Sequence, residues 1–83
     1  MQFTAQLMRF PGKGGWHFVV LPEEPEVYGA FGRVPVLATV DGRSWETSIW
    51  KHSEGGAILP VPARIRRGKG VGERVSVRIE DRG

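Results

Sequence analysis

Apolar and polar residues alternate with a period of two along most of this chain, and short clusters of glycine and proline interrupt the alternation. The clearest alternating stretches are residues 3–7, 34–40, 43–51 and 75–79. A period of two places every second side chain on one face of a strand, whereas an amphipathic helix needs a period near 3.6. The pattern therefore predicts an all-β fold.

Six strands are expected, and short apolar runs supply the two that do not alternate cleanly. Their ranges are 3–7, 16–21, 34–40, 43–51, 57–61 and 75–79. In the second of these strands, alternation assigns Trp16, Phe18 and Val20 to the core face. In the fourth, Trp45, Thr47 and Ile49 share one face of the strand, and Trp50 lies on the other.

Turn signals separate the strands. Asp41-Gly42 predicts a two-residue hairpin of type I′, because both central residues of that turn need a positive φ. Helix is limited to one turn within 25–31 and another within 62–68. In the latter, Pro62 suits a first helical position and Gly68 a C-terminal stop.

The length of 83 residues is that of one small domain spanning 1–83, close to the lower limit for a core without covalent links. Cysteine is absent, which excludes disulfides and thiolate metal sites. No stretch reaches the roughly 20 apolar residues of a membrane span, and the N-terminal residues lack a signal-peptide pattern. A cytoplasmic protein with no membrane contact is expected.

Positive charge is concentrated in the last part of the chain. Of 12 basic and 9 acidic residues, five basic and six acidic residues precede Arg64, a net charge of −1. From Arg64 onward there are seven basic and three acidic residues, a net charge of +4. Such asymmetry is compatible with an anionic partner such as nucleic acid, and equally with a solvated basic surface.

Two segments of the chain resemble each other. In each, a short apolar strand ends in Leu-Pro, a turn-like linker follows, and Arg-Val-x-Val opens an alternating strand. Leu21 aligns with Leu59, and Arg33 with Arg74. Neither copy is long enough to bury its apolar face alone, so the copies are expected to pack together and to close into a small barrel.

The order of four motifs resembles a bacterial family, the domain of unknown function nineteen-oh-five. They are W-x-F-V-V-L-P at 16–22, F-G-R-V-P-V-x-A-T-V-D-G at 31–42, I-L-P-V at 58–61 and G-E-R-V-x-V-x-I-E-D at 72–81. The resemblance implies a double-split β-barrel, the architecture of AbrB, MazE and MraZ, with the two repeats as its halves. It assigns no catalytic residues and no cofactor. It implies either an isolated domain or one fused to a YdeI/OmpD-associated domain.

The stretch RIRRGKGVGERV, residues 64–75, has the glycines and cations of a phosphate-binding loop. A P-loop or a dinucleotide-binding loop must open a helix, however, and these glycines lead into a strand. A nucleotide cradle is therefore excluded. Two readings stay open: a solvated connector between strands, or backbone contacts to nucleic acid through Arg64, Arg66, Arg67 and Lys69.

A second candidate surface is the cluster Trp50, Lys51 and His52, where an exposed indole would lie beside a cation. The alternative is a tryptophan that caps one end of the barrel. Ser48, His52 and Glu54 supply the residue types of a hydrolase triad but no nucleophile elbow. No grouping of His, Asp and Glu has the spacing of a zinc site.

The expected function is that of a non-enzymatic binding or accessory module without cofactor, either a monomer or a small homo-oligomer, with a protein, a small molecule or a fused domain as its partner. The alternatives are an AbrB-like nucleic-acid-binding protein and, more remotely, a small hydrolase built around His52.

Overall fold

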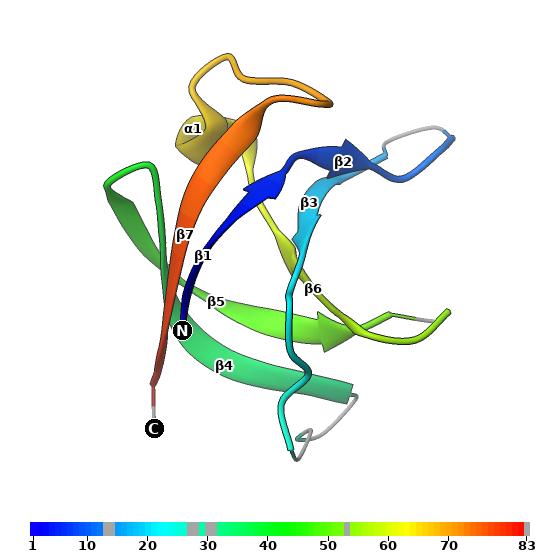
Figure 1. Ribbon diagram of the computed structural model, residues 1–83, viewed down its shortest axis with the longest axis vertical. Coiled ribbons are helices and arrows are strands. Elements are labelled where there is room, and N and C mark those ends of the chain that lie inside the picture. The colour runs from blue at the N-terminus through cyan, green and yellow to red at the C-terminus, as the bar shows by residue number, and fades with distance from the viewer. Residues whose placement is uncertain (13–14, 27–28, 30–31, 53, 83) are drawn as a thin grey trace.

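The computed structural model describes residues 1–12, 15–26, 29, 32–52 and 54–82. Within them lie seven strands and one helical turn (Figure 1). These elements are β1 (Gln2–Gln6), β2 (Met8–Arg9), β3 (His17–Val20), β4 (Arg33–Val40), β5 (Arg43–Lys51), β6 (Ala57–Pro60), α1 (Ala63–Arg66) and β7 (Arg74–Asp81). The predicted all-β class is confirmed. None of the helix in the described part of the chain is long and apolar enough to cross a membrane.

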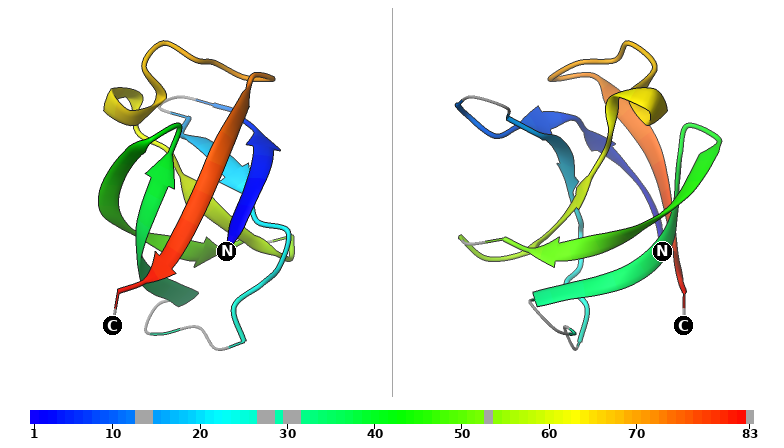
Figure 2. Two further views of the ribbon diagram at one scale, coloured as in Figure 1. Left: turned by 60° about the vertical axis from the view of Figure 1, so that its left-hand side comes forward. Right: turned by 180° about the vertical axis from the view of Figure 1, so that it is seen from behind.

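All seven strands belong to one antiparallel sheet in the order β1-β7-β4-β5-β6-β3-β2. The two outermost strands, β1 and β2, are consecutive in the sequence and are separated by Leu7 alone. The sheet therefore curls into a nearly closed barrel, as the two views in Figure 2 show. The two edge strands of the sheet are parts of one bent strand.

Leu7 is the residue at which the first strand changes its pairing partner from β7 to β3. Its side chain is 1% exposed. Its N–H donates to the carbonyl of Glu73 at 2.9 Å, and its own carbonyl accepts from Gly72 N–H at 2.8 Å. These bonds hold the bend against the segment just before β7, so β1 pairs with β7 while β2 turns to pair with β3.

The strand register follows the internal repeat. Aligning Leu21 with Leu59 makes Val20 equivalent to Ile58, and these two residues pair directly between β3 and β6. Aligning Arg33 with Arg74 makes Ala38 equivalent to Ile79, and these pair between β4 and β7. Equivalent residues that face each other define a pseudo-two-fold axis, so the two copies are the halves of the barrel.

The same axis relates the bent first strand to β5. Val36 and Val77 are equivalent, and they pair with Thr47 of β5 and Phe3 of β1 respectively. The first half is thus β1/β2, β3 and β4, and the second is β5, β6 and β7. The six predicted strands are confirmed if β1 and β2 are counted as one strand with a bend.

The core fills the inside of the barrel with alternate side chains of its strands. In β4 and β7, every second residue is buried. No polar or charged side chain is buried among the described residues. The core residues are Leu7, Val19, Leu21, Val36, Ala38, Val40, Trp45, Ile49, Ala57, Leu59, Val61, Ile65, Val75, Val77 and Ile79.

Both the hairpin and the second helical turn are confirmed. Asp41 and Gly42 have φ values of 48° and 84°, as a type I′ turn requires. Pro62 precedes α1 as its N-cap, and the helix ends at Arg67, whose φ of 52° is left-handed. Gly68 continues with a positive φ, so the stop begins one residue earlier than predicted. The turn predicted within 25–31 falls partly on residues outside those described.

The predicted core face of β3 is wrong. Val19 and Leu21 enter the core, while Trp16 and Val20 are 59% and 46% exposed. Phe18 is buried, but on the outer face of the sheet, stacked on Phe10 with ring centroids 4.2 Å apart. The run WHFVVL carries apolar residues on both faces of the strand, so alternation does not show which face points to the core. A shift by one residue exchanges the two faces.

We predict that Leu7→Ala destabilises the protein by about 2–5 kcal/mol, because it empties a fully buried position at the closure of the barrel. Met8→Ala is the matched control. Met8 adjoins Leu7 but is 46% exposed, and its loss should change stability by less than about 0.5 kcal/mol. Urea unfolding of both variants measures the difference, and equal stability would show that Leu7 does not hold the closure.

Candidate functional site

The basic run at 64–69 forms α1 and the turn after it, above one end of the barrel. Arg64 and Arg67 are exposed, whereas Arg66 and Lys69 are partly buried. Neither exposed arginine makes a side-chain hydrogen bond or ion pair with another described residue. The structure thus divides the four cations into two that face solvent and two that contact the protein.

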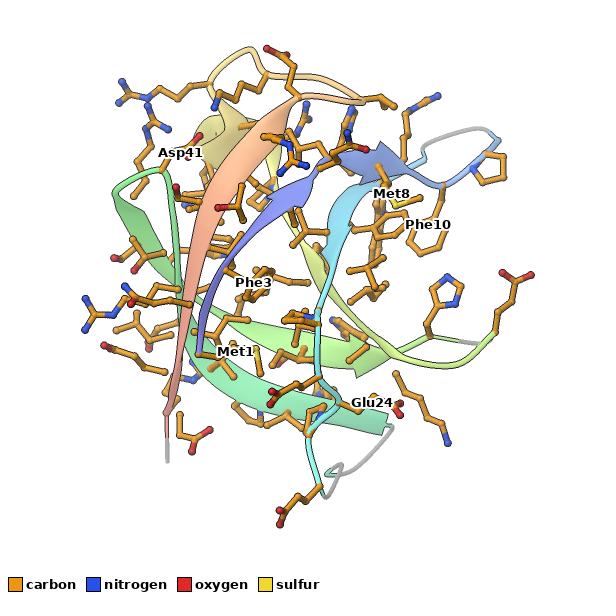
Figure 3. All side chains as sticks on the ribbon, in the orientation of Figure 1. Met1, Phe3, Met8, Phe10, Glu24 and Asp41 are labelled. Atoms are coloured by element: carbon orange, nitrogen blue, oxygen red, sulfur yellow. The ribbon has the colours of Figure 1, made fainter. Side chains whose placement is uncertain are left out.

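Lys69 connects three segments of the chain. Its Nζ donates to Asp41 Oδ2 and to the carbonyl of Arg74, both at 2.8 Å. Asp41 Oδ1 also accepts the backbone N–H of Ser76 at 2.9 Å. The hydrogen bond from Lys69 and the N–H of Ser76 together lower the pKa of the Asp41 carboxyl. Asp41 lies at the tip of the β4–β5 hairpin (Figure 3), so Lys69 ties that tip to the start of β7.

Arg66 is held by main-chain carbonyls. Its Nε donates to the carbonyl of Val61 at 3.2 Å, and its Nη1 donates to the carbonyl of Lys69 at 3.3 Å. A guanidinium has five N–H donors, so these contacts leave three for another partner. The two bonds hold the guanidinium in place, and its other N–H groups make no hydrogen bond to a described residue.

A cleft of about 420 Å³ opens beside Arg66 at this end of the barrel. Figure 2 shows α1 and the beginning of β3 at the same end. The cleft lies between β3, β5, the end of β6 and α1. Its lining residues are Gly15, Trp16, His17, Trp45, Thr47, Pro60, Val61, Pro62, Ala63 and Arg66.

Local backbone geometry places the aromatic groups of the cleft. Gly15 passes so close to Phe10 that a Cβ at this position would collide with the Phe10 carbonyl oxygen. The chain then enters β3 with Trp16 at the rim, where its side chain stays 59% exposed. Trp45 is 8% exposed and belongs to the core. The indole of Trp45 is therefore a buried wall of the cleft, and the indole of Trp16 is its solvent-exposed rim.

The charges that act on His17 in the cleft are positive. The pKa of His17 is lowered, first by partial burial and then by the charges of Arg66 and Arg9. Arg9 pairs with His17 across β2 and β3. His17 is therefore neutral at pH 7, and none of the described lining residues is acidic. Chemically, this arrangement offers an anion a fixed guanidinium and offers a flat ring an indole face.

Lys51 does not share a face of β5 with Trp50. Trp50 lies on the outer face of β5, with the Arg33 guanidinium 5.6 Å from its ring centre. Lys51 is the next residue of the strand, on the opposite face, and is exposed. The ring of His52 stacks on Phe10 at 5.9 Å. The partly exposed Trp50 lies on the outside of the barrel, and it is Trp45 that reaches its end.

His52 borders an apolar groove of about 570 Å³ on the outside of β2, β3 and β6. Met8 and Phe10 line it and lie on the opposite side of Figure 3 from Asp41. His52 Nδ1 accepts the backbone N–H of Glu54 at 3.1 Å. In a catalytic triad, this nitrogen would donate to the carboxylate. The predicted alternative of a hydrolase with Ser48, His52 and Glu54 gains no support from this geometry.

Sequence reasoning placed Arg66 among the candidates but missed Trp16, His17, Trp45 and Thr47. Their convergence depends on β5, β6 and β3 lying side by side, which no local pattern shows. One signal was available for Trp16, because it directly follows the glycine-rich segment PGKGG and so stands at the end of its strand. The described residues include no group of three or more metal-ligating side chains.

The fold and the cleft define a small all-β barrel with an aromatic and cationic opening at one end. A family model described as a domain of unknown function, DUF1905, matches residues 3–79. The chain belongs to this family, as its motifs suggested. No curated protein matches the chain.

We predict that Asp41→Asn lowers stability at pH 7 by about 0.5–1 kcal/mol, because it removes a partly exposed ion pair while keeping the turn and the bond to Ser76. The lowered pKa of Asp41 means that its stabilisation is present above the ordinary carboxyl pKa and is lost as the pH falls through the folded value. The difference between wild type and variant should therefore vanish in acid.

The control is Glu80→Gln, which breaks the Arg78–Glu80 pair. Its side chains are 57% and 45% exposed, against 38% and 22% for Lys69 and Asp41. Thermal unfolding from pH 2 to 8 compares the two variants. Identical pH profiles would contradict a special role for the Lys69–Asp41 pair.

Proposed function

We propose that this domain is a non-enzymatic binding module and that its ligand occupies the cleft beside α1. One observation carries the proposal: the cleft brings an exposed indole and an immobilised guanidinium to the same opening. Binding sites are typically concave and largely apolar, with a few fixed polar groups. The cleft has this composition, and its volume falls within the usual range of about 300–1,000 Å³.

The exposure of Trp16 supports this assignment. A tryptophan is mostly buried in folded proteins, and exposing 59% of one forgoes favourable burial. Indole rings are also favoured at binding surfaces, since they contribute large contact area with few rotatable bonds. Trp16 therefore has the properties of a contact residue that a ligand would cover.

The fixed position of Arg66 supports it from the polar side. A free arginine loses side-chain entropy when it binds, whereas Arg66 is already ordered by the carbonyls of Val61 and Lys69. The cost of ordering this side chain falls on folding and not on binding. Such preorganisation is the usual way in which a small site gains affinity.

The non-enzymatic part of the proposal rests on the residue types in the cleft. His17 and Thr47 supply an imidazole and a hydroxyl, and no described lining residue adds a carboxylate. A nucleophile requires an adjacent base, and that base requires a group that orients it. The lining suits recognition better than bond cleavage.

The test is a titration of ¹⁵N-labelled protein with ring compounds bearing acidic, neutral or basic substituents, followed through the three indole N–H signals. We predict that ligands shift the signals of Trp16 and Trp45 and leave that of Trp50, on the outer face, unchanged. Trp16→Ala should weaken binding about tenfold, consistent with roughly 1–3 kcal/mol for stacking on one ring, while Trp50→Ala should not. Shifts confined to Trp50, or to the groove around His52, would contradict the proposal.

Nucleic-acid binding is a second candidate, favoured by the exposure of Arg64 and Arg67 close to the cleft. Only these two of the four predicted cations have solvent-facing side chains without a described partner. Phosphate contacts alone would give sequence-independent binding that weakens with salt.

We predict for this candidate that fluorescence anisotropy detects DNA binding at about 50 mM salt that falls steeply by about 200 mM. The double variant Arg64→Ala/Arg67→Ala should lose the binding. The control, Arg78→Ala/Arg82→Ala, removes the same charge from arginines that pair with Glu80 and Glu46. If both variants lost DNA affinity equally, binding would depend on net charge alone, and a defined site would be refuted.

A further inference from the structure

We infer that the cleft recognises a flat ring that carries one anionic group, with the ring against Trp16 and the anion on the free edge of Arg66. This inference rests on the proposed function and specifies its ligand. The anionic group is a carboxylate or a phosphate, since a guanidinium binds both in the same bidentate geometry.

The preference for an anion follows from the donors that remain on Arg66. Two of its N–H groups donate to the carbonyls of Val61 and Lys69, and these bonds hold the guanidinium at the cleft that it lines. Arg9, paired opposite His17, adds a second positive charge nearby. With no acidic residue among the described lining, neither cation is neutralised within the cleft.

The preference for a ring follows from the walls. Trp16 offers an exposed indole, and Pro60, Val61 and Pro62 form an apolar surface on the β6 side. The volume of about 420 Å³ is at the small end of ligand sites. It suits a single small molecule, or one terminal nucleotide, better than a length of polymer.

His17 makes this recognition sensitive to pH. The groups that act on it are Arg66 from α1 and Arg9 from β2, and both oppose its protonation. The cleft residues of β5 and β6 are Trp45, Thr47 and Pro60, and none of them carries a titratable group; nor do Val61 and Pro62, which follow β6. A bound anion would offset the two cations and favour the imidazolium, so binding would take up a proton and affinity would rise as the pH falls.

The test compares three probes by tryptophan fluorescence and calorimetry: 2-naphthoate, its neutral analogue 2-naphthamide, and adenosine 5′-monophosphate. We predict that 2-naphthoate binds at least tenfold more tightly than 2-naphthamide, and more tightly at pH 5.5 than at pH 7.5, since a charge-assisted pair is about twice as strong as a neutral one. Tighter binding of the monophosphate would identify phosphate as the preferred anion, and tighter binding of 2-naphthoate would identify carboxylate.

Three variants locate the effect. Arg66→Gln should abolish the preference for the anion, whereas Arg64→Gln, on the same helical turn but exposed, should keep it. His17→Gln should remove the pH dependence and retain the binding. Because the two naphthalene probes are compared on the wild-type protein, the result does not depend on Arg66→Gln folding normally.

The outcomes separate the two proposals. Equal binding of 2-naphthoate and 2-naphthamide, with shifts at Trp16 and Trp45, would overturn the anion preference and leave the cleft as the binding site. Binding of all three probes elsewhere, or of none, would overturn both.

Discussion

Closure of the sheet at Leu7 is the constraint on which the rest of this structure depends. A sheet with two free edges exposes unpaired N–H and C=O groups, and a barrel removes them. Here one strand supplies both edges, because it pairs with β7 before Leu7 and with β3 after it. Two backbone hydrogen bonds, with Gly72 and Glu73, hold the bend, and the buried side chain of Leu7 fixes its position.

The position of the cleft follows from this closure. With β2 drawn against β3, the beginning of β3 is carried to the end of the barrel where β6 leads into α1. Elsewhere in the barrel, inward-facing residues of β3 and β5 are covered by other core side chains. At this end they meet a helix of a single turn, whose one buried residue, Ile65, anchors it while Arg66 reaches the opening. The same packing that completes the barrel thus leaves an aromatic and cationic surface at its end.

Much of the fold could be predicted from the sequence, because its signals are local. Alternation predicts β4, β5 and β7, Asp41-Gly42 predicts the hairpin, and the Leu-Pro and Arg-Val repeat predicts the pairing of the halves. The core face of β3 could not be predicted, since WHFVVL offers an apolar residue to both sides. β2 could not be predicted, because a strand of two residues is too short to show an alternating pattern. The cleft joins residues from three separated segments of the chain, so its composition depends on strand order and not on any motif.

The pseudo-two-fold axis relates two strand positions that carry different side chains in the two halves of the barrel. Thr47, in the cleft, occupies the place that Phe3 occupies in the other half, because their partners Val36 and Val77 are equivalent. Phe3, labelled in Figure 3, packs against the core. Where one half carries a phenyl ring packed against the core, the other carries a hydroxyl side chain that lines the cleft. A duplicated architecture can therefore keep one copy of a position for packing and use the other copy to line a cleft.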